Sequence, residues 1–144
     1  MDGTPRFVVI AGCGRFGSYL ANNLSRSGCS VVVVDIDPSA FLELTDEFSG
    51  FKVEGEITEI ALLRRTKLEE ADVFIAATRE DNVNLMVTQI AREIFGVSEV
   101  YARVNDPNRR EVFEEMNIMT ICPVIVSGDA LLRELGVEDD RQIP

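Results

Sequence analysis

Short apolar runs alternate along the chain with stretches in which apolar residues recur every three or four positions. The four valines at 31–34 have no polar face, which is typical of a strand covered on both sides. Phe16, Leu20 and Leu24 follow the first apolar run at helical spacing, and Ser27-Gly28 ends that pattern. The alternation predicts strands at 6–12, 29–37, 51–58, 72–78, 99–104 and 118–124, and helices at 16–27, 38–48, 59–71, 82–95, 108–116 and 127–135.

Residues that favour helix ends support this division. Asp37 can cap the second helix, and Pro38 suits its first position. We expect Thr58 and Ser127 to open two later helices, and Gly96 to close another. A strand–helix unit repeated six times predicts an α/β protein, a Rossmann-like doubly wound parallel six-stranded sheet with helices on both faces. The expected domain spans 1–136, and 137–144 is expected to be a polar tail.

Composition narrows the class of protein. Apolar residues make up 46% of the 144, enough for a sizeable core. The net charge of −11 argues against nucleic-acid binding, which needs clustered Lys and Arg. No apolar run reaches the roughly 18 residues of a membrane span, and the first residues show no signal pattern. We therefore expect a cytoplasmic protein without direct membrane insertion.

Cysteine and histidine usage bears on chemistry. Three cysteines without a C-x-x-C pair predict neither a zinc site nor a disulfide framework, but small buried residues in a reducing compartment. Cys13 is an exception, because at a helix start its thiol pKa is expected to fall. The chain has no histidine, which removes the commonest general base and weighs against a dehydrogenase or hydrolase.

A glycine-rich loop follows the first predicted strand. Gly12, Gly14 and Gly17 have the spacing G-x-G-x-x-G, and Asp35 ends the next strand 18 residues after Gly17. This offset is near the roughly 20 residues of the dinucleotide-binding fingerprint, in which the glycine motif also follows a strand and opens a helix. Gly12 permits a tight turn, Gly14 lets the backbone approach phosphates, and Gly17 allows close packing of the helix. Free N–H groups and the helix dipole then attract phosphate, even in an acidic protein.

Asp35 is expected to accept both ribose hydroxyls, and its charge would repel a 2′-phosphate, so NADP is disfavoured. The alternative is a vestigial loop. The other predicted strand ends are also polar, at 55–58, 77–82 and 103–106. Thr78 could reach phosphate or ribose there, and Glu56 the adenine edge. Arg15 and Arg103 could face phosphates, although an isolated arginine is more often solvated or paired with an acid.

Several stretches together resemble the N-terminal lobe of RCK (regulator of potassium conductance) domains, which include the Trk and Ktr potassium-uptake regulatory subunits. They are "VVIAGCGRFG", "VVVVDIDP", "VEGEITE", "DVFIAATREDNVN", "VYARVNDPN" and "ICP". The resemblance covers about residues 6–135. It implies a Rossmann-type sheet, a bound NAD(H) or adenine nucleotide (AMP, ADP or ATP), and dimers assembled into cytoplasmic rings that gate a potassium-translocating membrane subunit.

The resemblance also implies a set of binding residues. Gly12, Gly14, Arg15 and Gly17 match the phosphate loop, Asp35 the ribose acid, and Thr78 and Arg103 phosphate-side positions. Glu56 stands where the family usually has Asp, so the adenine-side contact is less secure. No catalytic or metal residue is expected. With their neighbours in these motifs, the candidate cofactor-binding residues are Gly12, Cys13, Gly14, Arg15, Phe16, Gly17, Asp35, Ile36, Asp37, Gly55, Glu56, Ile57, Ala77, Thr78 and Arg103.

The favoured function is a nucleotide-sensing regulatory subunit that gates a potassium transporter or channel. The alternatives are an NAD(H)- or adenylate-sensing or redox module for another partner and an NAD-dependent oxidoreductase fragment. The apolar face of the helix at 127–135 is expected to dock on another subunit, itself or a sister RCK subunit; the alternative is that it folds back on its own sheet. The resemblance implies a second, C-terminal lobe in many relatives, so this chain is expected either to stand alone or to receive that lobe from another subunit.

Overall fold

The computed structural model describes residues 6–137, and its strands form one sheet in which every neighbouring pair is parallel. The strand order β3-β2-β1-β4-β5-β6 reverses direction at β1, which pairs with both β2 and β4. This order confirms the doubly wound sheet that the sequence predicts. The strands are β1 (Phe7–Ala11), β2 (Ser30–Asp35), β3 (Phe51–Glu54), β4 (Val73–Ala76), β5 (Glu99–Arg103) and β6 (Met119–Ile121).

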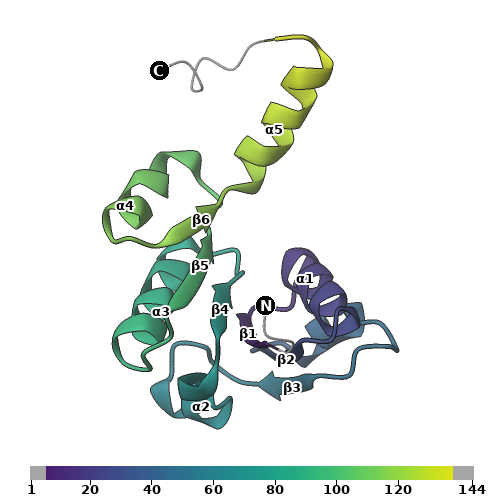
Figure 1. Ribbon diagram of the computed structural model, residues 1–144, viewed down its shortest axis with the longest axis vertical. Coiled ribbons are helices and arrows are strands. Elements are labelled where there is room, and N and C mark those ends of the chain that lie inside the picture. Colours follow the sequence, from purple (N-terminus) through teal and green to yellow (C-terminus); the bar gives the residue numbers. More distant parts are fainter. Residues whose placement is uncertain (1–5, 138–144) are drawn as a thin grey trace.

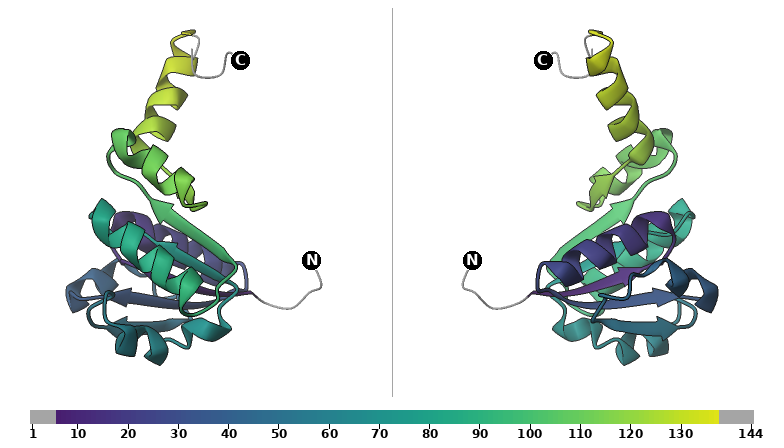
Figure 2. Two further views of the ribbon diagram at one scale, coloured as in Figure 1. Left: turned by 90° about the vertical axis from the view of Figure 1, so that its left-hand side faces the viewer. Right: turned by 90° about the vertical axis from the view of Figure 1, so that its right-hand side faces the viewer.

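Helices cover both faces of the sheet, with α1 on one side and α2 and α3 on the other (Figure 2). Short 3₁₀ turns join or extend several of them. The helices are α1 (Arg15–Arg26), α2 (Ile60–Arg65), α3 (Asp81–Glu93), α4 (Arg110–Glu115) and α5 (Pro123–Glu134), and the 3₁₀ turns are η1 (Pro38–Glu43), η2 (Leu68–Glu70) and η3 (Pro107–Arg109).

The core is divided between the two faces of the sheet because successive strand residues point to opposite sides. Val32 and Val34 belong to the cluster that packs against α2 and α3, whereas Val31 and Val33 belong to the cluster on the α1 side. All four valines are buried. A third, smaller cluster around Phe113 joins α4 to β5. The unbroken apolar run at 31–34 is therefore explained by a strand with two covered faces.

Two predicted helices are shorter than the sequence suggests. The helix expected at 38–48 is only the 3₁₀ turn η1, although Asp37 caps it and Pro38 begins it as expected. Beyond it the backbone N–H of Thr45 donates to Asn22 Oδ1 on α1, so a tertiary contact replaces helix continuation. The helix expected at 59–71 is divided into α2 and η2 by Lys67, whose φ is +60°, and Glu59 rather than Thr58 occupies the cap position.

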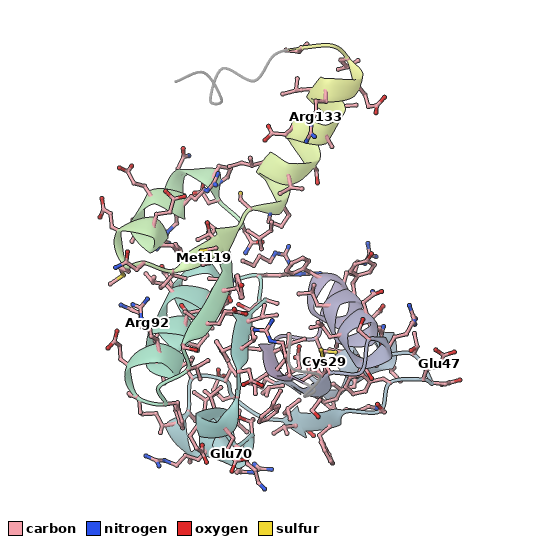
Figure 3. The ribbon with its side chains drawn as sticks, viewed as in Figure 1. Cys29, Glu47, Glu70, Arg92, Met119 and Arg133 are labelled. Atoms are coloured by element: carbon pink, nitrogen blue, oxygen red, sulfur yellow. The ribbon has the colours of Figure 1, made fainter. Side chains whose placement is uncertain are left out.

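The last strand and helix also differ from the prediction. The strand ends at Ile121, and α5 begins at Pro123 rather than near Ser127, because proline suits the first position of a helix. Helix α5 projects away from the sheet in every view (Figures 1 and 2). Arg133 on it lies far from the sheet and Met119 lies on β6 (Figure 3). None of the α5 residues is buried, so the helix does not fold back on its own sheet.

Within the described residues, no helix has the length and apolar character needed to cross a membrane. Residues 138–144 of the expected polar tail lie outside the described part of the chain.

Candidate nucleotide-binding site

Two glycines of the loop after β1 are required by close backbone packing. At Gly12, φ is +105° and an added Cβ would lie 3.0 Å from the carbonyl carbon of Ala77. At Gly17, an added Cβ would lie only 1.9 Å from the carbonyl oxygen of Gly12. The loop is therefore held against the end of β4 on one side and against the first turn of α1 on the other. These contacts fit the turn and packing roles expected from the motif.

Gly14 differs from its neighbours because it faces open space. An added Cβ at Gly14 would meet no atom within 4 Å, and the residue is exposed. It occupies the cap position of α1, where the first backbone N–H groups of a helix lack partners within the helix. The structure thus offers free N–H donors beside a residue without a side chain. A phosphate group fits such a place.

Asp35 lies at the end of β2 and reaches into this loop. Its Oδ2 accepts a hydrogen bond of 2.7 Å from the backbone N–H of Cys13, and its Oδ1 accepts one of 2.9 Å from the N–H of Asp37. The two bonds fix the carboxylate beside the glycine loop, and each oxygen retains a lone pair for another donor. Ile36, the residue between, is 64% exposed at the same strand end. Asp35 is therefore a positioned acceptor next to Gly14.

The expectation of a lowered thiol pKa at Cys13 is wrong. The side chain is fully buried, and burial raises the pKa of the Cys13 thiol to about 11, with the charges of Asp35 and Glu43 adding to the rise. Cys13 is a free thiol, as are Cys29 and Cys122. A neutral thiol without access to solvent is a poor nucleophile and a poor redox sensor. Cys13 therefore contributes to this site through its backbone N–H.

The turn after β3 adds a second wall near Asp35. Gly55 N–H donates to the Asp35 carbonyl at 3.0 Å, and its φ of +156° favours glycine. Glu56 Oε1 accepts from the N–H and hydroxyl of Thr58 at 3.4 and 3.2 Å, so its carboxylate stabilises the turn. Ile57 is buried in the core beside Leu62, so its side chain does not face the site. Of these candidates, Gly55 makes a direct hydrogen bond to Asp35.

Arg103 connects the far side of the sheet edge to the glycine loop. It ends β5, yet its guanidinium carbon lies 5.5 Å from the centre of the Phe16 ring in the first turn of α1. Its Nε is buried and has no hydrogen-bond partner among the described residues. Arg15, also in that turn, is exposed to solvent. The structure therefore brings Phe16 and Arg103 together, although they are 87 positions apart (103 − 16).

Thr78 follows Ala77 just beyond β4, and its polar groups are already engaged. Its N–H and its hydroxyl both reach Asn84 Oδ1, at 3.1 and 2.6 Å. The N–H of Glu80 in turn donates to the Thr78 hydroxyl at 3.2 Å. Thr78 thus forms part of the wall beside Gly12, where an added Cβ on the glycine would come within 3.1 Å of the Thr78 nitrogen.

Sequence reasoning missed a polar network behind Thr78. Asn84 is fully buried on α3, and Asp81 in the first turn of that helix accepts from the N–H and side-chain amide of Asn105 at 2.7 and 2.9 Å and from the N–H of Asp106 at 3.0 Å. A usable signal was present for Asn84, because it precedes Val87 and Ala91 on the apolar face of the helix. An amide at such a position needs buried partners.

The hydrogen bonds of Asp81 depend on its charge. Burial raises the pKa of its carboxyl, but the N–H groups of Asn105 and Asp106 and the Asn105 amide outweigh burial and hold the pKa below its usual value. The carboxylate is therefore charged at neutral pH. Its contribution to stability is present above its ordinary pKa and is lost as the pH falls through the lowered one.

The sequence of this chain was compared with protein-family models and with known proteins. A protein-family model described as the TrkA-N domain matches residues 8–123. The chain is 42% identical over 128 residues to the Trk system potassium uptake protein TrkA of Streptomyces coelicolor, covering 89% of this chain and 57% of that protein. The chain thus spans a little over half the length of that relative.

Two solved structures share the fold. The Kef C-terminal domain of Shewanella denitrificans in its AMP-bound form has a TM-score of 0.79 at 21% identity, covering 90% of this chain and 79% of that one. The GsuK channel bound to NAD has a TM-score of 0.67 at 20% identity, covering 84% of this chain and 22% of that one. Because the family model spans the loop, the strand ends and the sheet described above, this chain belongs to the TrkA-N domain family.

Proposed function

We propose that this chain binds an adenine nucleotide, NAD(H) or AMP, ADP or ATP, and that it acts as a nucleotide-sensing regulatory subunit of a potassium uptake transporter or channel. One observation carries the proposal: the Asp35 carboxylate is fixed by the Cys13 and Asp37 N–H groups beside the open position at Gly14. An acceptor for ribose hydroxyls and donors for phosphate then lie at one sheet edge, as in dinucleotide-binding folds.

The residues present fit a phosphorylated ligand. Gly14 leaves free the space that a side chain would fill. Arg103 supplies a buried Nε donor without a partner among the described residues, next to Phe16 in the first turn of α1. A buried guanidinium donor without an acceptor is costly, and a phosphate oxygen would supply that acceptor. Asp35 would hold the ribose, while the backbone around Gly14 and Arg103 would hold phosphate.

The regulatory role rests on the family and on the names of the relatives. The Streptomyces relative is named as a potassium uptake protein. The GsuK structure is that of a channel bound to NAD, and the Kef domain was solved with AMP. We infer a cytoplasmic protein held at the inner face of the membrane by a potassium-translocating subunit, with no enzymatic activity of its own. A co-purification of that membrane subunit with the tagged chain tests the inferred partner.

Asp35→Ala should weaken the binding of NAD or ADP, because the ribose loses its charged acceptor. A hydrogen bond to a charged group is worth roughly 1.5–3 kcal/mol, or about 10- to 150-fold in affinity. Titration calorimetry with both nucleotides measures the change. The unsubstituted chain should also prefer NAD to NADP, because the carboxylate repels a 2′-phosphate.

Glu54→Ala is a suitable control for the Asp35 experiment. Glu54 lies opposite Asp35 on β3 and is exposed. Its replacement by alanine removes the same charge from the same sheet edge. We expect its nucleotide affinity to stay close to that of the unsubstituted chain. Unchanged affinity in a folded Asp35→Ala protein, or a preference for NADP, would contradict the assignment of Asp35.

We also propose that α5 docks on another subunit, which makes the protein a dimer or a larger ring with itself or with a sister subunit. Leu131 on α5 and Leu135, the residue that caps its C-terminus, are 61% and 66% exposed and lie one turn apart. Covering each would contribute about 1.5–3 kcal/mol before entropy is subtracted. Replacing both with glutamate should shift the mass measured by light scattering at micromolar concentration towards the monomer.

Arg133→Glu is the matched control for this experiment. It adds negative charge to the same helix, but position 133 lies about 200° around the helix from position 131. Its assembly state should not change. A monomeric unsubstituted chain that also captures no sister RCK subunit from cell extract would defeat the proposal.

A further inference from the structure

The side-chain amide of Asn84 makes four hydrogen bonds, all of them to residues that flank the candidate site. Its Oδ1 accepts from the N–H and the hydroxyl of Thr78, at 3.1 and 2.6 Å. Its Nδ2 donates to the carbonyl oxygens of Thr78 and Arg103, at 2.9 and 2.8 Å. Because a backbone N–H can only donate and a carbonyl can only accept, the orientation of the amide is fixed by its partners.

The position of Asn84 shows what these bonds add to the sheet. The hydrogen-bond ladder between β4 and β5 ends at the pair Ala76↔Ala102, before either strand reaches the candidate site. Thr78 and Arg103 lie beyond that last pair, where no backbone ladder joins the two segments. Asn84 connects them there, since one side chain bonds to both at 2.9 and 2.8 Å. A longer bond of 3.4 Å, from the Asn105 side-chain amide to the Thr78 carbonyl oxygen, also joins the two segments. The Asn84 amide therefore sets the spacing between the two strand ends at the edge of the sheet where the site lies.

Each of the two strand ends contacts the glycine loop region. The Thr78 nitrogen lies against Gly12, and the Arg103 guanidinium lies over the ring of Phe16. A change in the spacing of Thr78 and Arg103 would therefore move the buried Arg103 Nε relative to the loop. Asn84 itself is fully buried and does not need to touch a ligand to have this effect.

We propose that Asn84 is a positioning residue for nucleotide binding, which holds Thr78 and Arg103 in the arrangement that receives the phosphate part of the ligand. This inference rests on the proposed nucleotide site. It assigns to a buried amide on α3 a role in affinity that goes beyond packing. The role is specific to the phosphate part, because Asp35 and the β3 turn, which would hold the adenosine part, make none of their hydrogen bonds with Asn84.

The test compares Asn84→Ala with Thr88→Val, using ADP and adenosine as probes. Thr88 is buried one turn further along α3, but its hydroxyl bonds only to the carbonyl oxygens of Asn84 and Leu85 in its own helix. The control therefore loses a buried polar group without loosening either strand end. We expect Asn84→Ala to weaken ADP binding by about 10- to 100-fold. This is the loss of affinity that follows, in metal sites, when a residue that orients a ligand side chain is removed. Adenosine affinity, measured by NMR titration at millimolar concentration, should stay unchanged, and Thr88→Val should bind both as the unsubstituted chain does.

The outcomes separate this inference from the proposed function. If the unsubstituted chain does not bind ADP, the proposed function fails and the inference with it. If it binds ADP and a folded Asn84→Ala protein binds equally well, or loses ADP and adenosine in equal proportion, only the inference is overturned. Should Asn84→Ala fail to fold, Asn84→Ser leaves a smaller cavity and is judged by the same ratio of affinities.

Discussion

Gly14→Val should abolish most nucleotide binding while leaving the fold intact. The valine side chain would fill the space beside the free N–H groups of α1, where we propose that phosphate binds. A loss of about 100-fold in affinity, or roughly 2.7 kcal/mol, is expected. Stability should change little, because an added Cβ at Gly14 meets no atom within 4 Å and the backbone is extended, with φ −73° and ψ −161°.

Two measurements on the Gly14 variants check this expectation. Calorimetric titration with ADP gives the affinity, and thermal unfolding followed by circular dichroism gives the stability. Gly14→Ala has a shorter side chain and should lose less affinity than Gly14→Val. Nucleotide binding by Gly14→Val at the affinity of the unsubstituted chain would show that this loop does not hold phosphate.

Gly17→Ala should destabilise the fold. The new methyl group would lie 1.9 Å from the carbonyl oxygen of Gly12, so α1 would have to move away from the sheet. Overpacking of this kind costs about 3 kcal/mol of unfolding free energy at the upper end of its usual range. Helix propensity acts in the opposite direction, because alanine within a helix is about 1 kcal/mol better than glycine. The sign of the change therefore separates close packing from propensity.

Urea unfolding measures this change directly. Ser18→Ala is the neighbouring control, because Ser18 is also buried on α1 and its hydroxyl donates, among the described residues, to the Arg15 carbonyl at 3.3 Å. We expect a much smaller loss of stability for Ser18→Ala than for Gly17→Ala. A Gly17→Ala protein as stable as the unsubstituted chain would mean that α1 can shift without cost.

The sheet could be predicted from the sequence because its signals are local. The valines at 31–34 and the alternation of apolar runs with helical spacing predict the parallel sheet and its helices. Helix lengths could not be predicted in the same way. The conformation of the segment after η1 depends on the bond from Thr45 to Asn22. The start of α5 depends on Pro123, which follows a strand of only three residues. Both depend on contacts between segments.

In the candidate site, too, local features could be predicted and features that depend on tertiary contacts could not. Spacing alone located the glycine loop and Asp35, because the motif lies within one strand–helix–strand unit. The raised pKa of Cys13 depends on how deeply the loop is buried, which spacing does not reveal. The contact of Arg103 with Phe16 and the four bonds of Asn84 join residues from different units of the fold. Such pairings become visible only when the strands are placed side by side.

Helix α5 packs little against the rest of the described chain. It has twelve residues, none of them buried, and it extends away from the rest of the molecule (Figure 1). Isolated helices shorter than about 12–15 residues are marginal in water. A surface that covers Leu131 and Leu135 would therefore also stabilise the helical backbone. If α5 docks on another subunit as we propose, helix formation and subunit association would be thermodynamically linked, and the affinity between subunits would include the free energy of ordering the helix.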